Sequence, residues 1–160
     1  LAEDVTKPFR AACPEATDVE WALRFVASLD NVAVILSGMS NQEQMEQNLA
    51  TFQDIKPLNE AEQQAVKDVM AAIHAKPLVP CTGCRYCMDC PFGVDIPGVF
   101  QIYNDYQMFN VFERSQERYR KLVADGHGVD QCRNCKACMK HCPQSIEIPT
   151  RLAEIHEILK

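Results

Sequence analysis

Residues 81–91 read CTGCRYCMDCP, and residues 132–143 read CRNCKACMKHCP. Eight of the nine cysteines of the chain lie in these two runs. In each run three cysteines are separated by two residues, and a fourth cysteine stands directly before a proline. Behind the runs, residues 90–97 (CPFGVDIP) return as residues 142–149 (CPQSIEIP) with a period of 52 residues. The sequence therefore predicts an internal duplication with pseudo-twofold symmetry.

The spacing of the second run is that of a bacterial ferredoxin. A cubane 4Fe-4S cluster needs four thiolates, and three closely spaced cysteines can wrap three of its corners. In two-cluster ferredoxins the fourth thiolate comes from the cysteine before proline in the other run. We therefore predict two 4Fe-4S clusters with crossed ligation. The first is assigned to Cys81, Cys84, Cys87 and Cys142, and the second to Cys132, Cys135, Cys138 and Cys90.

Disulfide bonds and structural zinc are two alternative uses of these cysteines. Disulfides are disfavoured because no signal peptide precedes the runs and because triplets at this spacing are poor disulfide partners. Structural zinc normally uses two separated pairs of ligands, although zinc could fill the sites of protein purified in air. The ninth cysteine, Cys13, lies outside both runs and is interpreted as a small, partly buried apolar residue.

The segment between the runs has apolar residues at helical spacing and lacks the short hairpins of a compact ferredoxin. These residues are Val99, Ile102, Tyr103, Tyr106 and Phe109. Over residues 78–160 the chain resembles the α-helical ferredoxin domains of fumarate reductase iron–sulfur subunits and heterodisulfide reductases. The resemblance implies electron transfer to or from a redox partner protein.

Charge and hydropathy exclude some classes of function. The net charge of −6 argues against a nucleic-acid partner, and no apolar run is long enough to span a membrane, so we expect a cytoplasmic protein. The charge is uneven, because residues 113–160 carry nine Lys/Arg against seven Asp/Glu. Cations beside the second run are expected to offset the negative charge of a cluster with four thiolates: Arg133, Lys136 and Lys140.

The amino-terminal part alternates between helix and strand signals. A capping box at Thr17 and Glu20 predicts a helix with one apolar face, formed by Val19, Ala22, Phe25, Val26 and Leu29. Residues 32–36 are a continuous apolar run of strand length, of the kind that is buried in a parallel sheet. Ser40 and Glu43 predict the start of a second helix. A further helix is expected from Asn59, with an apolar stripe at Ala65, Val66, Val69, Met70 and Ile73.

Three segments of this part resemble the last turn of an aldo/keto reductase barrel: residues 21–25 (WALRF), 34–39 (VILSGM) and 43–49 (EQMEQNL). The resemblance covers roughly residues 14–55. It implies that the loop and helix after the last strand hold the adenosine end of NADP or NAD, with the helix start meeting phosphate. By position, the implied contacts are Ser37, Gly38, Met39, Ser40, Gln44 and Asn48.

The aspartate, tyrosine, lysine and histidine that catalyse hydride transfer in that family have no counterparts in these 160 residues. We therefore expect the chain to be the carboxy-terminal part of a larger oxidoreductase, unable to transfer hydride by itself, with the missing catalytic barrel as one partner. The predicted fold class is mainly α. Residues 1–76 form a helix–strand–helix remnant of a TIM-type barrel plus a following helix, and residues 77–160 form an α-helical ferredoxin domain.

The predicted function is electron transfer through two 4Fe-4S clusters. One alternative is an electron-transfer subunit of a heterodisulfide reductase or fumarate reductase type of complex. Another is a non-redox interaction module that uses metal to hold its fold together. With a single strand signal, residues 1–55 are not expected to rebuild a sheet.

Overall fold

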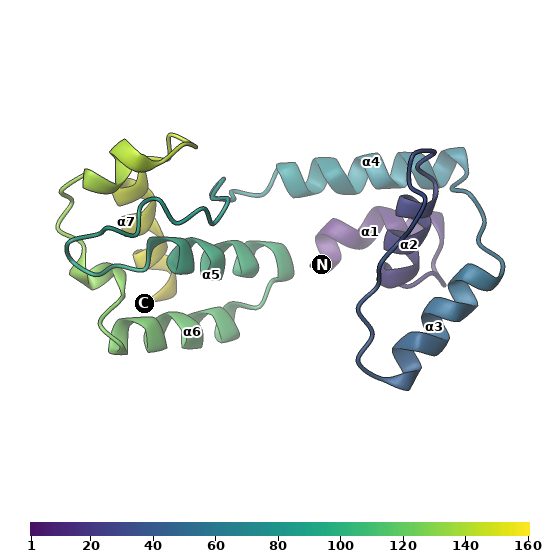
Figure 1. Cartoon of the computed structure of the whole chain (residues 1–160), viewed down its shortest axis with the longest axis horizontal. Helices are drawn as coiled ribbons and strands as arrows, with labels where there is room; N and C mark the ends of the chain where they lie inside the picture. The colour runs from purple at the N-terminus through teal and green to yellow at the C-terminus, as the bar shows by residue number, and fades with distance from the viewer. The chain divides into compact units, whose positions relative to one another are not determined.

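A computed structural model describes all 160 residues and contains helices but no strand. The chain divides into two compact units (Figure 1). The amino-terminal unit is Glu3–Ile73, and the carboxy-terminal unit is His74–Lys160 together with Leu1–Ala2. The predicted mainly α class is confirmed. None of the helices is long and apolar enough to cross a bilayer.

The helices of the amino-terminal unit are α1 (Glu3–Ala12), α2 (Asp18–Ala27), α3 (Gln42–Gln53) and α4 (Glu60–His74). Two of their predicted starts are confirmed. The Thr17 hydroxyl accepts a hydrogen bond from the Glu20 backbone N–H at 3.1 Å, which caps α2. Before α4, Asn59 and Glu62 form a reciprocal capping box, with each side chain accepting from the other residue's N–H at 2.9 Å.

The apolar face predicted for α2 is wrong. The structure buries Trp21 and Leu23 of this helix, while Val19 and Phe25 are exposed. Trp21 belongs to a small core with Ala16, Leu58 and Ala65, and the ring of Phe9 stacks on it at 4.4 Å between centroids. Phe9 lies in α1, which has an internal proline and which the sequence analysis did not predict. Cys13 is half-buried and packs against this core, in agreement with its interpretation as an apolar residue.

The strand predicted at residues 32–36 is also wrong. This segment has neither strand nor helix structure, and the side chains of Val34 and Leu36 are 75% and 92% exposed. A strand needs a neighbour for its backbone hydrogen bonds, and no other segment of the chain supplies one. As expected, residues 1–55 form no sheet. The cap of α3 is Asn41, which accepts from the Gln44 N–H, and not Ser40.

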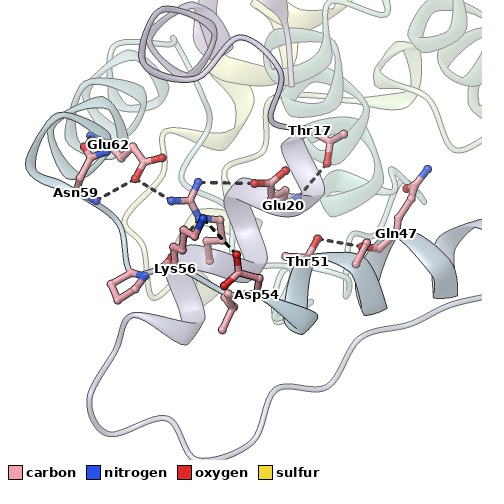
Figure 2. A pocket seen from close by; sticks show the side chains of 12 residues that line it. Thr17, Glu20, Gln47, Thr51, Asp54, Lys56, Asn59 and Glu62 are labelled. Atoms are coloured by element: carbon pink, nitrogen blue, oxygen red, sulfur yellow. Dashed lines mark hydrogen bonds and ion pairs between the residues drawn. The ribbon is translucent and has the colours of Figure 1, made fainter.

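A polar pocket of ≈ 730 Å³ lies among α2, α3 and the segment leading into α4 (Figure 2). Its centre is the Arg24 guanidinium, which donates to the Glu62 carboxylate at 2.8 Å and to the Lys56 carbonyl at 3.3 Å. Both side chains of the ion pair are buried, with 11% of Arg24 and 7% of Glu62 exposed. Burial by itself raises the pKa of Glu62, but the hydrogen bond from Arg24, the Asn59 N–H and the charge of Arg24 together lower it.

Replacing this carboxylate, in Glu62→Gln, is expected to lower the free energy of unfolding of this unit by about 3 kcal/mol at neutral pH, because the Arg24 charge stays buried without its partner. Since the folded-state pKa of Glu62 is lowered, its stabilisation is present above the unfolded-state pKa and is lost as pH falls through the folded-state pKa. The difference in the free energy of unfolding between wild type and Glu62→Gln should therefore become smaller at acidic pH.

Urea unfolding followed by the fluorescence of Trp21, the single tryptophan, measures this gap. Glu20→Gln is the matched control. The Glu20 carboxylate is more exposed and lies 3.7 Å from Arg24, so its loss is expected to cost less than about 1 kcal/mol. Equal destabilisation by the two variants, or a gap that does not depend on pH, would contradict the role assigned to Glu62.

The carboxy-terminal unit is built on α5 (Ile96–Phe109), α6 (Phe112–Ala124) and α7 (Ile148–Leu159). Figure 1 shows α5 and α6 side by side, joined by a tight turn in which Asn110 adopts a left-handed conformation with φ 53°. α5 also packs against α7. The helix predicted from the apolar spacing between the two runs is confirmed as α5. Both α5 and α7 begin at the repeated Ile-Pro pair, with the proline in the first turn.

One hydrophobic core joins the three helices. Its largest fully buried members are Phe100 and Ile96 from α5, Tyr119 from α6, and Leu152 and Ile155 from α7. Most of the cysteines of the two runs pack against this core while remaining half-buried: Cys81, Cys87, Cys90, Cys132, Cys138 and Cys142. Both cysteine runs therefore pack against the same hydrophobic core.

Candidate metal centre

Two small cavities in the carboxy-terminal unit collect the eight cysteines of the runs. Each takes three cysteines from one run and the cysteine before proline from the other. The cavity that we call the first site is lined by Cys81, Cys84, Cys87 and Cys142. The second site is lined by Cys132, Cys135, Cys138 and Cys90. These are the two groups of four predicted from the sequence.

The backbone of the two runs repeats the same irregular conformation. Three positions in each run have positive φ, and they fall at matching places relative to the cysteines. The pairs are Gly83 (69°) with Asn134 (53°), Arg85 (64°) with Lys136 (63°), and Gly93 (78°) with Ser145 (51°). Left-handed residues in a tight loop can turn backbone N–H groups toward a shared concavity, which suits an anion such as an iron–sulfur cluster. The internal duplication therefore extends to the backbone geometry of both sites.

Hydrogen bonds hold the start of the first run in place. The side chain of Asn104, in α5, accepts from the Val79 N–H and donates to the Val79 carbonyl, both at 2.9 Å. The carboxy-terminal end of the first duplicated segment is held by hydrogen bonds as well. The Asp95 N–H donates to the His127 carbonyl at 3.0 Å, and the His127 ring lies 2.8 Å from the Gly93 carbonyl. Asn104 and His127 were not recognised as supporting residues in the sequence, because isolated polar residues carry no spacing signal.

The thiols of each site affect one another. Burial, together with smaller contributions from the charges of Cys81, Cys138 and Cys142, raises the pKa of Cys87 to about 11. Burial also raises the pKa of Cys138, with added contributions from Cys132, Cys135 and Cys90. Without metal these thiols hold their protons at neutral pH, so that binding of a metal centre has to release them.

The four candidate metal ligands at each site are all cysteine thiols. Thiolates are soft ligands that favour iron–sulfur clusters, Zn²⁺ and Cu(I) over Mg²⁺ or Ca²⁺. The middle cysteine of each triplet, Cys84 or Cys135, is exposed, whereas the other six are half-buried. The cysteine composition therefore fits two metal–sulfur groups, each held by three half-buried cysteines and one exposed cysteine. No group of three or more His, Cys, Asp or Glu side chains is placed to hold a single metal ion.

The residues implied as nucleotide contacts belong to the amino-terminal unit, where they lie just before α3 and in its first two turns. Residues 37–40 are exposed, and Asn48 is buried and donates to the Ser37 hydroxyl at 2.9 Å. The Gln44 side chain accepts from the Ser40 N–H at 2.8 Å. Their polar groups bond to one another, and none of the six residues lines the pocket of Figure 2.

Comparison with protein families finds a 4Fe-4S dicluster domain at residues 80–147. This match supports 4Fe-4S clusters and, in general terms, iron–sulfur electron transfer. The match does not include residues 1–79 or 148–160. Searches of curated proteins and of solved structures gave no match.

Proposed function

We propose that the chain transfers single electrons through two 4Fe-4S clusters, one at each of the two sites, with crossed ligation. The observation that carries the proposal is the composition of the cavities, since each unites a triplet with the cysteine before proline of the other run. The dicluster domain match over residues 80–147 supports the type of cluster. The clusters supply one-electron redox chemistry.

The protein's own residues position and shield these groups. The apolar core beneath the runs excludes water from one side of each site, which strengthens the electrostatic interactions there. Cys84 and Cys135 are exposed, so a redox partner can approach each site at this residue. This arrangement suits a relay in which a partner protein exchanges electrons at the surface and the duplicated sites pass them within the domain.

Anaerobic reduction with dithionite, followed by electron paramagnetic resonance, tests the proposal. We expect two paramagnetic clusters in reduced protein, because both sites have a complete set of four thiols. Iron and sulfide analysis of the same sample serves as the control for occupancy. Full occupancy by iron and sulfide without any signal on reduction would instead favour the non-redox, metal-stabilised module.

We further propose that residues 1–76 belong to an aldo/keto reductase-like oxidoreductase whose catalytic barrel lies outside these 160 residues. The supporting observation is a set of apolar side chains left exposed in and after the predicted strand, where such a barrel would cover them: Val34, Leu36, Met39, Met45, Leu49 and Phe52. In that setting the start of α3 would bind NADP or NAD.

The gene around these residues tests the barrel proposal. Strands encoded upstream together with a catalytic tyrosine and lysine would support it. A stop codon just upstream of Leu1 would overturn it, and the runner-up would then apply: a small electron-transfer subunit of a heterodisulfide reductase or fumarate reductase type of complex.

A further inference from the structure

The duplicated sites differ in charge. The reduction potential of an iron–sulfur cluster depends on cluster type, solvent exposure, hydrogen bonds to sulfur and nearby charge. Several of these factors are matched between the sites. Both have four cysteines, one exposed cysteine, and left-handed residues at the same three positions. Any difference between the two potentials therefore depends strongly on the charged side chains around each site.

The second site is lined by two cations, Arg133 and Lys136. Both are exposed and neither forms an ion pair or side-chain hydrogen bond. No acidic residue lines this cavity. The residues that line the second site therefore carry two positive charges and no negative charge.

The first site is lined by one cation only. At the position that matches Arg133 it has Thr82, which carries no charge, and at the position that matches Lys136 it has Arg85. The Arg85 guanidinium lies 3.8 Å from the Asp95 carboxylate, which offsets part of its charge. His141 also lines the site. The residues that line the first site therefore carry less positive charge than those that line the second.

We propose that the cluster of the second site has the higher reduction potential and takes up the first electron. Positive charge stabilises the reduced, more negative form of a cluster, so Arg133 and Lys136 raise the potential of the second site above that of the first. The inference rests on the proposed function, since it requires a reducible cluster at each site. It gives the domain a direction: an electron that enters at the first site passes on to the second.

A redox titration of the loaded protein with dithionite at pH 8, followed by electron paramagnetic resonance, tests the order. Cys135→Ser and Cys84→Ser assign the signals, because each alters one ligand of one site. We expect the signal that appears at the higher potential to be altered in Cys135→Ser. In Lys136→Gln, that higher potential is expected to shift downward while the lower one stays unchanged.

Arg85→Gln is the matched control, since Arg85 and Lys136 occupy equivalent left-handed positions. This variant should move only the lower potential. If Lys136→Gln loses a cluster, Arg133→Gln tests the other cation of the second site. In wild-type protein, added salt should reduce the difference between the two reduction potentials, because both cations are exposed. A first electron on the first site, or equal shifts of both potentials in Lys136→Gln, would overturn the inference. Absence of any reducible cluster would instead refute the proposed function.

Discussion

Complete removal of iron is expected to unfold the carboxy-terminal unit while α4 and the core around Trp21 persist. The reason lies in the construction of the sites. Residues 81–95 contain no helix or strand, and six cysteines pack directly on the hydrophobic core of the unit. Without metal, the raised pKa values of Cys87 and Cys138 leave protonated thiols around two cavities. Much of the folding free energy should therefore come from cluster binding.

Far-UV circular dichroism after anaerobic chelation measures this effect on the whole chain. We expect the loss of most of the signal from α5, α6 and α7, while the fluorescence of Trp21 reports on the amino-terminal unit in the same sample. Protein treated with iron-saturated chelator is the control. Unchanged circular dichroism after complete iron removal would show that the core of the unit is sufficient without metal.

The second large effect is expected from the cysteines that precede proline. Cys90→Ser should remove one ligand from the second site and leave the first site intact, and Cys142→Ser should do the reverse. Serine oxygen can replace a thiolate poorly, so the expected result is loss of one cluster, its conversion to a three-iron form, or a shifted potential.

Variants within the triplets serve as references for these spectra. Cys90→Ser should resemble Cys135→Ser, and Cys142→Ser should resemble Cys84→Ser. If Cys90→Ser matched Cys84→Ser instead, each run would bind its own cluster and the crossed assignment would fail.

The sequence predicted the carboxy-terminal unit well because its signals are local. Cysteine spacing, the repeated Ile-Pro pair and the apolar period of α5 each determine structure over a few residues. The duplication then added long-range information, since matching runs imply matching sites. The supporting bonds of Asn104 and His127 were not predictable, because each joins segments far apart in the chain.

The amino-terminal unit shows why similar reasoning failed there. The apolar run at residues 32–36 has the composition of a buried strand, but burial depends on partners that these 160 residues do not supply. The apolar face predicted for α2 does not include Trp21, and the large ring of Trp21 determines which side of the helix is buried. The caps of α2 and α4 were predicted correctly because a cap involves only residues three positions apart, whereas the cap of α3 was predicted one residue too early.

The pairing of each triplet with a distant cysteine has a consequence for the unfolded chain. Under the proposed ligation each cluster is a cross-link, from Cys87 to Cys142 in one case and from Cys90 to Cys132 in the other. By the loop-closure estimate used for disulfides, a link over such a distance removes entropy from the unfolded chain and thereby raises its free energy by about 4 kcal/mol. Closure within one run would raise it by less than about 3 kcal/mol. The link from Cys90 to Cys132 is nested inside the link from Cys87 to Cys142, so losing either cluster still leaves α5 and α6 inside a closed loop.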